Sequence, residues 1–199
     1  MSSRDMLFVL LALAIVAAAS VAAVALWRKS RGKRGQELRE RFGPEYERLV
    51  TEYGGDPRRA ERELEDRTRR VRKLPIKELS AAERTSFAEA WRHTQERFVD
   101  TPSVAVRSAH DLVQQVMRAR GYPVDDFEQR VADLSVDHAT VVQHYRAAHI
   151  LHEKNRQGQG DTEELRQAMV HYRALFGELL GASMEQPSPS SRRLTTAHA

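Results

Sequence analysis

The sequence predicts an all-α protein with a single N-terminal transmembrane helix, a charged helical stalk and a small helical bundle. Four observations predict this architecture. A segment that is apolar except for one serine occupies residues 6–27, and later apolar residues recur at helical rather than alternating spacing. Proline stands where first helical turns would begin. A chain of 199 residues has room for one folded domain with accessory segments.

The apolar segment 6–27 carries no charge, and Ser20 is its only polar side chain. About 20 apolar residues are enough to cross a bilayer as a helix. A secretory signal, the alternative, would have a shorter apolar stretch and a basic beginning. The segment is therefore predicted to be a transmembrane anchor.

A basic collar, residues 28–35, follows this anchor. The expected membrane-surface side chains are Trp27, Arg28, Lys29, Arg31, Lys33 and Arg34. Because positive residues beside a span favour the cytoplasmic side, we expect a cell-membrane protein with its C-terminal domain in the cytoplasm. The collar would lie against anionic lipid of the bilayer. If the anchor were cleaved, the domain would instead be secreted or periplasmic.

The formal net charge of +4 comes from the collar. From Gly35 onward the chain has 26 basic and 27 acidic groups. A nucleic-acid-binding domain needs a basic patch on its folded part, so we expect no nucleic-acid partner. The chain contains no cysteine, which excludes thiolate nucleophiles and cysteine zinc sites.

Residues 36–73 are predicted to form the charged helical stalk. Its second helix has many opposite charges four residues apart, and only a thin apolar seam of Ala60, Leu64 and Val71. Its basic side chains could contact phosphate, but a solvated helix is the preferred interpretation. These side chains are Arg67, Arg69, Arg70, Arg72 and Lys73.

Residues 78–181 are predicted to form a domain of about five helices, and residues 182–199 a disordered tail. Gly121 is expected to stop one helix. The expected N-terminal caps are Ser80 with Glu83, Asp125 or Asp126, Asp137, and Asp161 or Thr162.

The tetrapeptide HYRA occurs twice, at residues 144–147 and 171–174. If the last two helices form an antiparallel hairpin, the two copies face each other at nearly the same level. The candidate polar cluster is then His144, Tyr145, Arg146, His171, Tyr172 and Arg173. Arginine could bind an anionic ligand through its planar fork. In the structural alternative, the tyrosine rings are buried while histidine and arginine stay at the rim.

Other chemistry is sparse. His149 and His152 are three residues apart on one expected helix, but a zinc site needs further ligands. The sequence has no glycine-rich nucleotide loop and no GxSxG turn for a serine nucleophile. We therefore expect no metal, no cofactor and no catalytic residue.

The stretch RARGYPVDDFEQRVADLSVDH, with YRAAH and TEELRQAMVHYRALFGELL further on, resembles a family of small uncharacterised bacterial proteins. The resemblance covers roughly residues 36–181, often behind an N-terminal apolar segment. It implies a shared helical domain and no particular catalytic or binding residue.

Together these patterns predict a membrane-anchored interaction or scaffold module with a protein partner. The alternative from another class is an enzyme or small-ligand-binding protein that uses the paired HYRA cluster.

Overall fold

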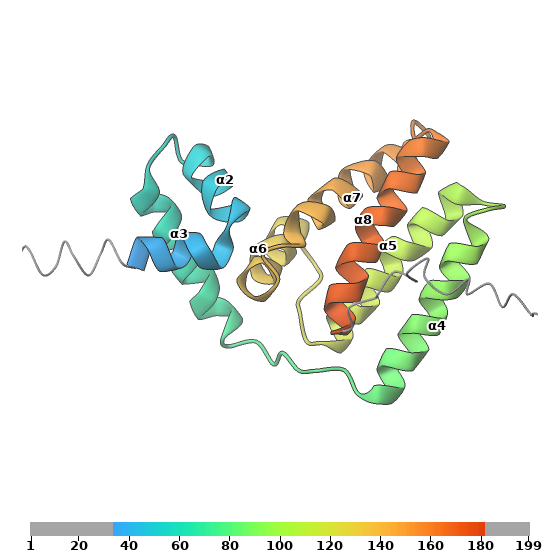
Figure 1. Cartoon of the computed structure of the whole chain (residues 1–199), viewed down its shortest axis with the longest axis horizontal. Helices are drawn as coiled ribbons and strands as arrows, with labels where there is room; N and C mark the ends of the chain where they lie inside the picture. The colour runs from blue at the N-terminus through green and yellow to red at the C-terminus, as the bar shows by residue number, and fades with distance from the viewer. Residues whose placement is uncertain (1–33, 182–199) are drawn as a thin grey trace, which may run out of the picture. The chain divides into compact units, whose positions relative to one another are not determined.

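The structure is a computed structural model that describes residues 34–181, and every regular element in that range is an α-helix (Figure 1). The all-α prediction is therefore confirmed for these residues. The apolar segment 6–27, residues 28–33 of the collar and the tail 182–199 lie outside the described residues. Between residues 34 and 181, no helix is both long and apolar enough to cross a bilayer.

The chain divides into two compact units between Arg70 and Val71. The described part of the first unit contains a helix at residues 34–42, then α2 (Pro44–Glu52) and α3 (Pro57–Val71), which ends at the boundary. Both prolines begin their helices as predicted, because the first turn needs no N–H donor and favours the fixed φ of proline.

The first unit has buried side chains of its own, although residues 36–73 were expected to form a solvated stalk. Its buried apolar residues are Phe42, Tyr46, Leu49, Ala60 and Leu64. Arg67 lies on the same seam, three residues after Leu64, and is only 5% exposed. The interpretation of Arg67 as a solvated or phosphate-binding side chain is therefore wrong.

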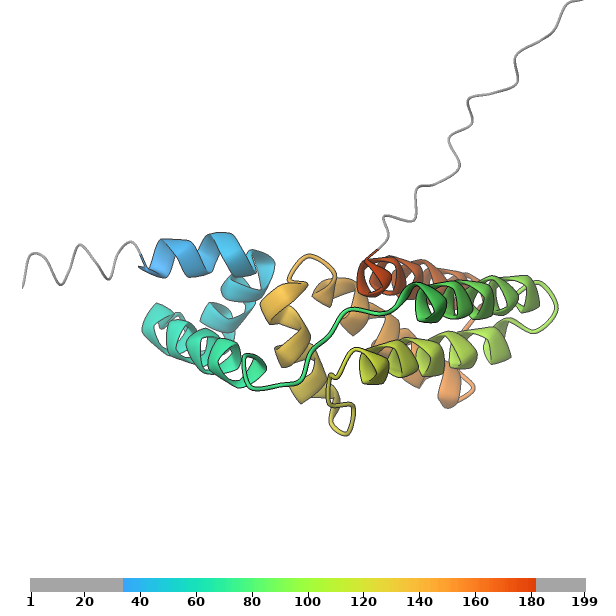
Figure 2. The ribbon, with the colours of Figure 1, turned by 90° about the horizontal axis from the view of Figure 1, so that it is seen from below.

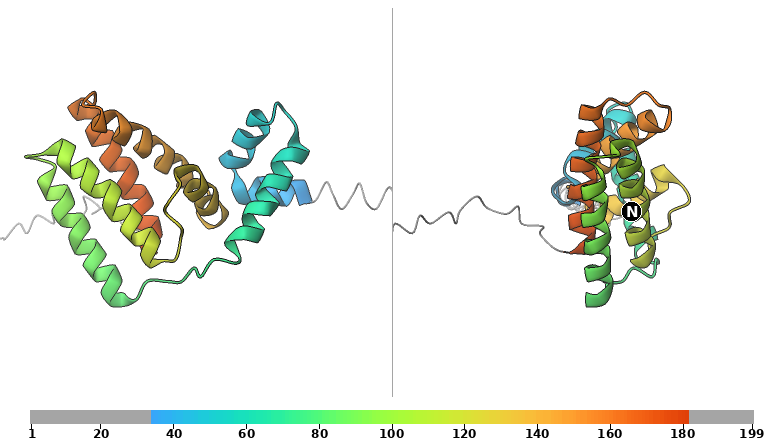
Figure 3. Two further views of the ribbon diagram at one scale, coloured as in Figure 1. Left: turned by 180° about the vertical axis from the view of Figure 1, so that it is seen from behind. Right: turned by 90° about the vertical axis from the view of Figure 1, so that its right-hand side faces the viewer.

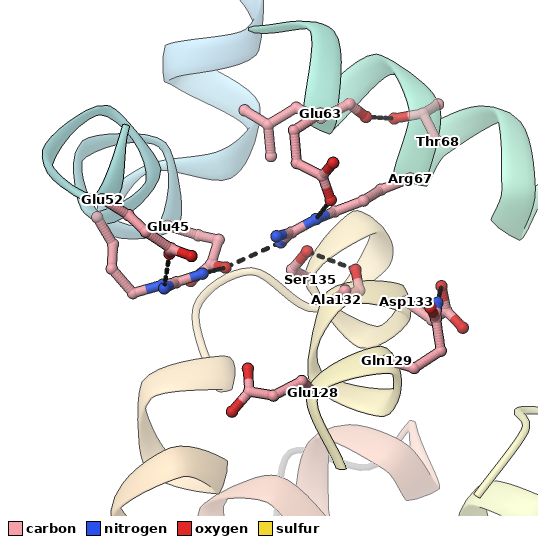
Figure 4. A network of polar contacts seen from close by, with 12 residues as sticks. Glu45, Glu52, Glu63, Arg67, Thr68, Glu128, Gln129, Ala132, Asp133 and Ser135 are labelled. Carbon is pink, nitrogen blue, oxygen red and sulfur yellow. Dashed lines mark hydrogen bonds and ion pairs between the residues drawn. The ribbon is translucent and has the colours of Figure 1, made fainter. Parts of the chain in front are cut away.

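Arg67 joins α3 to α2 through a buried ion pair (Figure 4). Its Nη1 donates to Glu45 Oε1 at 2.9 Å, and its Nε donates to Glu63 Oε1 at 2.9 Å. Arg48 donates two more hydrogen bonds to the Glu45 carboxylate, at 2.8 and 3.0 Å. The Glu45 side chain is fully buried. A buried charge without partners costs several kcal/mol, so these contacts are what allow Glu45 to be buried.

The described part of the second unit is a bundle of the predicted five helices. They are α4 (Ala81–Arg97), α5 (Pro102–Ala119), α6 (Phe127–Asp137), α7 (Val142–Arg156) and α8 (Thr162–Leu180). Helix α8 packs against α5 and α7, α5 also packs against α4, and α6 packs on α7. Figure 2 shows α4 and α8 together in one layer with α5 against them, and Figure 3 shows the α7–α8 hairpin from behind.

Side-chain caps explain where three of these helices begin. The confirmed caps are Ser80, Asp126 and Asp161, and the first and last of them form complete capping boxes. The expectation that Asp137 caps the next helix is wrong. The N–H of His138 still bonds to the carbonyl of Leu134 at 2.9 Å, so Asp137 is the last residue of α6. Helix α7 begins after Val141 without a side-chain cap.

The core of the second unit is a continuous apolar cluster contributed by all five helices. Trp91 of α4 is 1% exposed and stacks on Phe176 of α8, with ring centroids 4.8 Å apart. An aromatic pair of this kind contributes about 0.5–1.5 kcal/mol beyond the area it buries. This contact makes α4 part of the bundle rather than an appendage to α5.

The segment that leads into α4 is fixed to the end of α5. The N–H of Lys77 donates to the carbonyl of Arg120 at 2.9 Å. Gly121 has a φ of +90°, and a Cβ at this position would collide with the carbonyl of Pro75. Both the left-handed backbone and the close approach require glycine here, which explains why α5 stops at the predicted residue.

Candidate functional site

Of the expected membrane-surface residues, only Arg34 lies among the described residues. Its side chain is exposed, and its Nε is 3.6 Å from Glu65 Oε1. An exposed pair at this distance contributes little to stability. The remaining members, Trp27, Arg28, Lys29, Arg31 and Lys33, lie outside the described residues.

The histidines of the two HYRA copies meet across the α7–α8 hairpin. His144 Nδ1 and His171 Nδ1 are 2.9 Å apart, so one ring donates a hydrogen bond to the other. Burial, and then the nearby His144, lowers the pKa of His171. The two copies therefore do lie at the same level, as the spacing around the loop suggested.

The tyrosines of the two copies lie inside the bundle, and both side chains are fully buried. Their hydroxyls have different surroundings. The Tyr172 hydroxyl is 2.8 Å from His110 Nδ1 on α5, whereas the Tyr145 hydroxyl has no hydrogen-bond partner among the described residues. Burial raises the pKa of Tyr145 to about 12, so the phenol is neutral at physiological pH.

The two arginines do not converge on one ligand. Arg146 Nη1 donates to Glu128 Oε2 of α6 at 2.9 Å. Arg173 is half-buried and lines a groove formed with other residues of the second unit. The expected cluster of two histidines, two tyrosines and two arginines is thus only partly assembled.

A second polar group, which we call the buried polar cluster, lies among α5, α6, α7 and α8. Its members are His110, Arg130, Tyr145, His149, His152 and Tyr172. The rings of His110 and His152 stack at 3.9 Å, and that of His149 stacks on Phe127 at 3.7 Å. The guanidinium carbon of Arg130 is 6.0 Å from the centre of the Tyr145 ring.

A chain of hydrogen bonds fixes the tautomer of His110. Arg118 donates to Gln114 Oε1 at 3.2 Å, so the amide nitrogen of Gln114 faces His110 Nε2 at 2.6 Å. His110 Nε2 therefore accepts, and Nδ1–H donates to the Tyr172 hydroxyl. The chain connects the exposed end of Arg118 to the centre of the bundle.

The imidazoles of the buried polar cluster are neutral at physiological pH. Burial lowers the pKa of His110 to about 3, and the nearby His152, His149 and Arg130 act in the same direction. Burial is also the largest cause of the lowered pKa values of His149 and His152. Arg130, whose guanidinium stays protonated at any ordinary pH, is then the charged member of the cluster.

A groove of about 820 Å³ lies on another face of the second unit. The charged and polar side chains that line it are Glu78, Arg84, Arg120, His138, Arg173 and Glu178. Arg120 Nη1 donates to His138 Nε2 at 3.1 Å and to the Leu179 carbonyl at 3.2 Å, which fixes its position. The guanidinium of Arg173 has no hydrogen bond or ion pair with any other residue of 34–181.

His110 and Arg130 are absent from the sequence-based site, although the sequence carries a weak signal for each. His110 lies four residues after Val106 and three before Val113, on the apolar face predicted for its helix. Arg130 lies three residues after Phe127 and four before Leu134, on the apolar face of a short helix. A polar residue on an apolar face indicates a buried polar group, but the partners come from other helices and cannot be read locally.

Within residues 34–181, no three histidine, aspartate or glutamate side chains are placed to hold a metal ion. Comparison with protein-family models, with curated proteins and with solved structures finds no match to the chain. The argument for function therefore depends on the described side chains and the sequence.

Proposed function

We propose that the chain is a single-span membrane protein whose helical unit is an interaction module in the cytoplasm, with no catalytic step. The apolar segment 6–27 and the basic collar after it support the anchor and its orientation. The proposed partner is a protein that presents an acidic, extended segment to the groove of the second unit.

The observation that carries the proposal is the convergence of three guanidinium groups on one groove. Arg84 comes from α4, Arg120 from the end of α5 and Arg173 from α8. Arginine presents planar N–H donors that match carboxylates, and hydrogen bonds of this charged kind are stronger than neutral ones. Arg173 is the member with all of its donors available among the described residues, so we expect it to contact the partner's carboxylate.

The acidic residues of the groove limit its charge. Glu78 is paired with Arg84 at 3.3 Å, and Glu178 Oε1 is 3.0 Å from His138 Nδ1. Three arginines against two glutamates leave the groove with an excess of one positive charge. A segment with one or two carboxylates fits this excess better than a polyanion, which agrees with the absence of a basic patch on the folded part of the sequence.

Site-specific photo-crosslinking in host membranes tests the groove. Val170 lines it and is 51% exposed, whereas Ile150 is 67% exposed and does not line it. With a benzophenone amino acid at position 170 of the full chain, we expect one discrete crosslinked protein whose attached peptide is acidic. With the same probe at position 150 we expect none.

The substitution Arg173→Glu should abolish that crosslink by reversing the charge that meets the carboxylate. Arg166→Glu is the matched control, because Arg166 lies on the same helix, pairs with Glu163 and is outside the groove. Equal crosslinking at positions 150 and 170, or a crosslink that survives Arg173→Glu, would contradict the proposal. So would a crosslink to residues 182–199 of the same chain, which would make the tail the occupant.

Reporter fusions test the anchor separately. A C-terminal reporter that is active only in the cytoplasm should work, and one that is active only in the periplasm should not. The opposite result would contradict the cytoplasmic orientation and favour the secreted or periplasmic alternative. Deleting residues 1–33 should move the protein from the membrane fraction to the soluble fraction.

A further inference from the structure

The first step of the inference concerns Arg130 of α6, which is only 6% exposed. Its Nε and Nη1 are buried and have no hydrogen-bond partner among residues 34–181. Its guanidinium lies 5.9 Å from the centre of the Phe127 ring and 6.0 Å from that of Tyr145. Aromatic faces offset part of the cost of burying a cation, but they do not satisfy its N–H groups.

Two neutral donors lie beside Arg130. The Tyr145 hydroxyl and His149 Nδ1 are both buried and also have no partner among the described residues. A neutral imidazole can carry its proton on Nδ1, so both groups can donate a hydrogen bond. Buried polar atoms in native proteins almost always have partners, and with His152 Nδ1 the cluster has four residues that lack one among the described residues, an unusual number.

All three side chains contact the ring of Phe127. His149 stacks on it with centroids 3.7 Å apart, Tyr145 meets it edge-on at 5.2 Å, and Arg130 lies over it at 5.9 Å. One guanidinium and two neutral donors thus surround a single aromatic ring. This is the donor set of an anion site in which one group carries charge and the others fix orientation.

We propose that three members of the buried polar cluster bind a small monocarboxylate anion, with Arg130 as the charged anchor and Tyr145 and His149 as neutral donors. A single negative charge matches the single guanidinium, because the imidazoles of the cluster are neutral. Each nearby acid has a partner of its own: Glu128 pairs with Arg146, Glu153 pairs with Arg156, and Asp133 accepts a hydrogen bond from Gln129.

Thermal unfolding of the full chain in detergent tests the proposal, with sodium acetate as the probe. The chain has two tryptophans, so Trp27→Phe leaves Trp91 of the bundle core as the fluorescent reporter. Acetate is added at constant ionic strength against sodium chloride. The unfolding midpoint should rise saturably, and at a concentration of about 100 Kd the unfolding equilibrium constant should fall about 100-fold.

Tyr145→Phe is the decisive variant, because its hydroxyl has no partner and its removal should leave the fold intact. It should weaken acetate binding by about 3- to 10-fold, the effect of one lost hydrogen bond. The matched control is Tyr172→Phe, which removes a hydroxyl bonded to His110 and should change the midpoint but not the acetate affinity. Arg130→Met should abolish the acetate effect, while the exposed Arg166→Met should retain it.

Several results would overturn the proposal. One is an acetate shift no larger than that of chloride at equal ionic strength. Another is a Tyr145→Phe variant that binds acetate as tightly as the unmodified protein. This result would count against the proposal even if Arg130→Met did not fold. Stronger stabilisation by inorganic phosphate than by acetate would reject a monocarboxylate as the ligand class.

Discussion

Two buried arginines, one in each unit, have opposite environments. Arg67 of the first unit is 5% exposed and donates to Glu45 and Glu63. Arg130 of the second unit is 6% exposed and has no hydrogen bond or ion pair with any residue of 34–181. Equal burial therefore does not mean equal roles.

We interpret Arg67 as a charge that stabilises the fold, and Arg130 as the charge of the proposed anion site. Arg67 forms its contacts within the chain, and removing either Arg67 or Glu45 takes from the other its fully buried ion-pair partner. Arg130 forms no hydrogen bond or ion pair within the described residues, and this is the observation behind the anion site that we propose. Residues whose perturbed surroundings have no structural explanation are candidates for function.

The largest expected effect comes from Glu45→Ala in the first unit. Arg67 would lose its fully buried partner and keep its contact with the partly exposed Glu63, so the loss should be about 3 kcal/mol of local stability. Hydrogen exchange measured by mass spectrometry should show it as faster exchange of the α2 and α3 amides. The control is Glu52→Ala, since Glu52 is exposed and pairs with Arg48, and it should cost less than about 0.5 kcal/mol. Equal losses in the two variants would contradict a structural role for the buried pair.

Acid should destabilise the second unit through His110. Burial lowers its folded-state pKa to about 3, while an unfolded histidine has a pKa of about 6.5. The unfolded chain then binds a proton that the folded chain does not, so stability is complete above pH 6.5 and is lost as the pH falls toward 3. Between pH 6.5 and pH 5 this residue alone should cost about 2 kcal/mol.

Trp91 fluorescence in urea titrations at several pH values measures that loss. His110→Gln should reduce the pH dependence by up to one proton, because the substituted amide does not titrate. His93→Gln is the control, since His93 is exposed on α4. If both variants keep the wild-type slope, His110 is not the titrating group.

The tyrosines of the two HYRA copies should differ although their sequence context is the same. Tyr172→Phe removes the hydrogen bond to His110 and should cost about 1 kcal/mol. Tyr145→Phe removes a hydroxyl without a partner and should cost nothing measurable in acetate-free buffer. Urea titration of both variants gives the comparison, and equal costs would show that the two hydroxyls have equivalent surroundings.

The smallest expected effect is that of Arg130→Met in acetate-free buffer. Methionine keeps much of the apolar stem and removes a buried charge without an ion-pair partner, so the change in stability should stay within about 1 kcal/mol. The loss of the contacts with Phe127 and Tyr145 opposes the gain. A loss of 3 kcal/mol or more in the same urea titration would place Arg130 with Arg67 as a structural residue.

Much of the fold could be predicted because its signals are local. The capping boxes at Ser80 and Asp161 extend over four residues each, and proline and glycine mark their own backbone positions. The two HYRA copies are nearly the same number of residues from the loop between α7 and α8, and this spacing predicted that they lie opposite each other. Asp137 shows the limit, because whether an aspartate ends one helix or caps the next depends on how far the first helix continues.

The site could be predicted only in part, because its partners are distant in the sequence. The HYRA repeat correctly indicated a contact between His144 and His171, but the arginines of the repeat point to different neighbours. The bond between His110 and Tyr172 joins residues 62 positions apart. No periodicity within a helix predicts such a contact, and the same holds for the position of Arg130 beside Tyr145.

The docking of Pro75 and Lys77 on the end of α5 has a mechanical consequence. In a chain anchored at its N-terminus, tension that reaches the second unit first meets the hydrogen bond from Lys77 to Arg120 and the contact between Pro75 and Gly121. These two contacts and the packing of Ile76 and Leu79 on the core would yield at lower force than a helix packed in the bundle. Under tension, the segment that leads into α4 would therefore detach from α5 first. This would lengthen the connection between the membrane and the bundle while α4–α8 stayed folded.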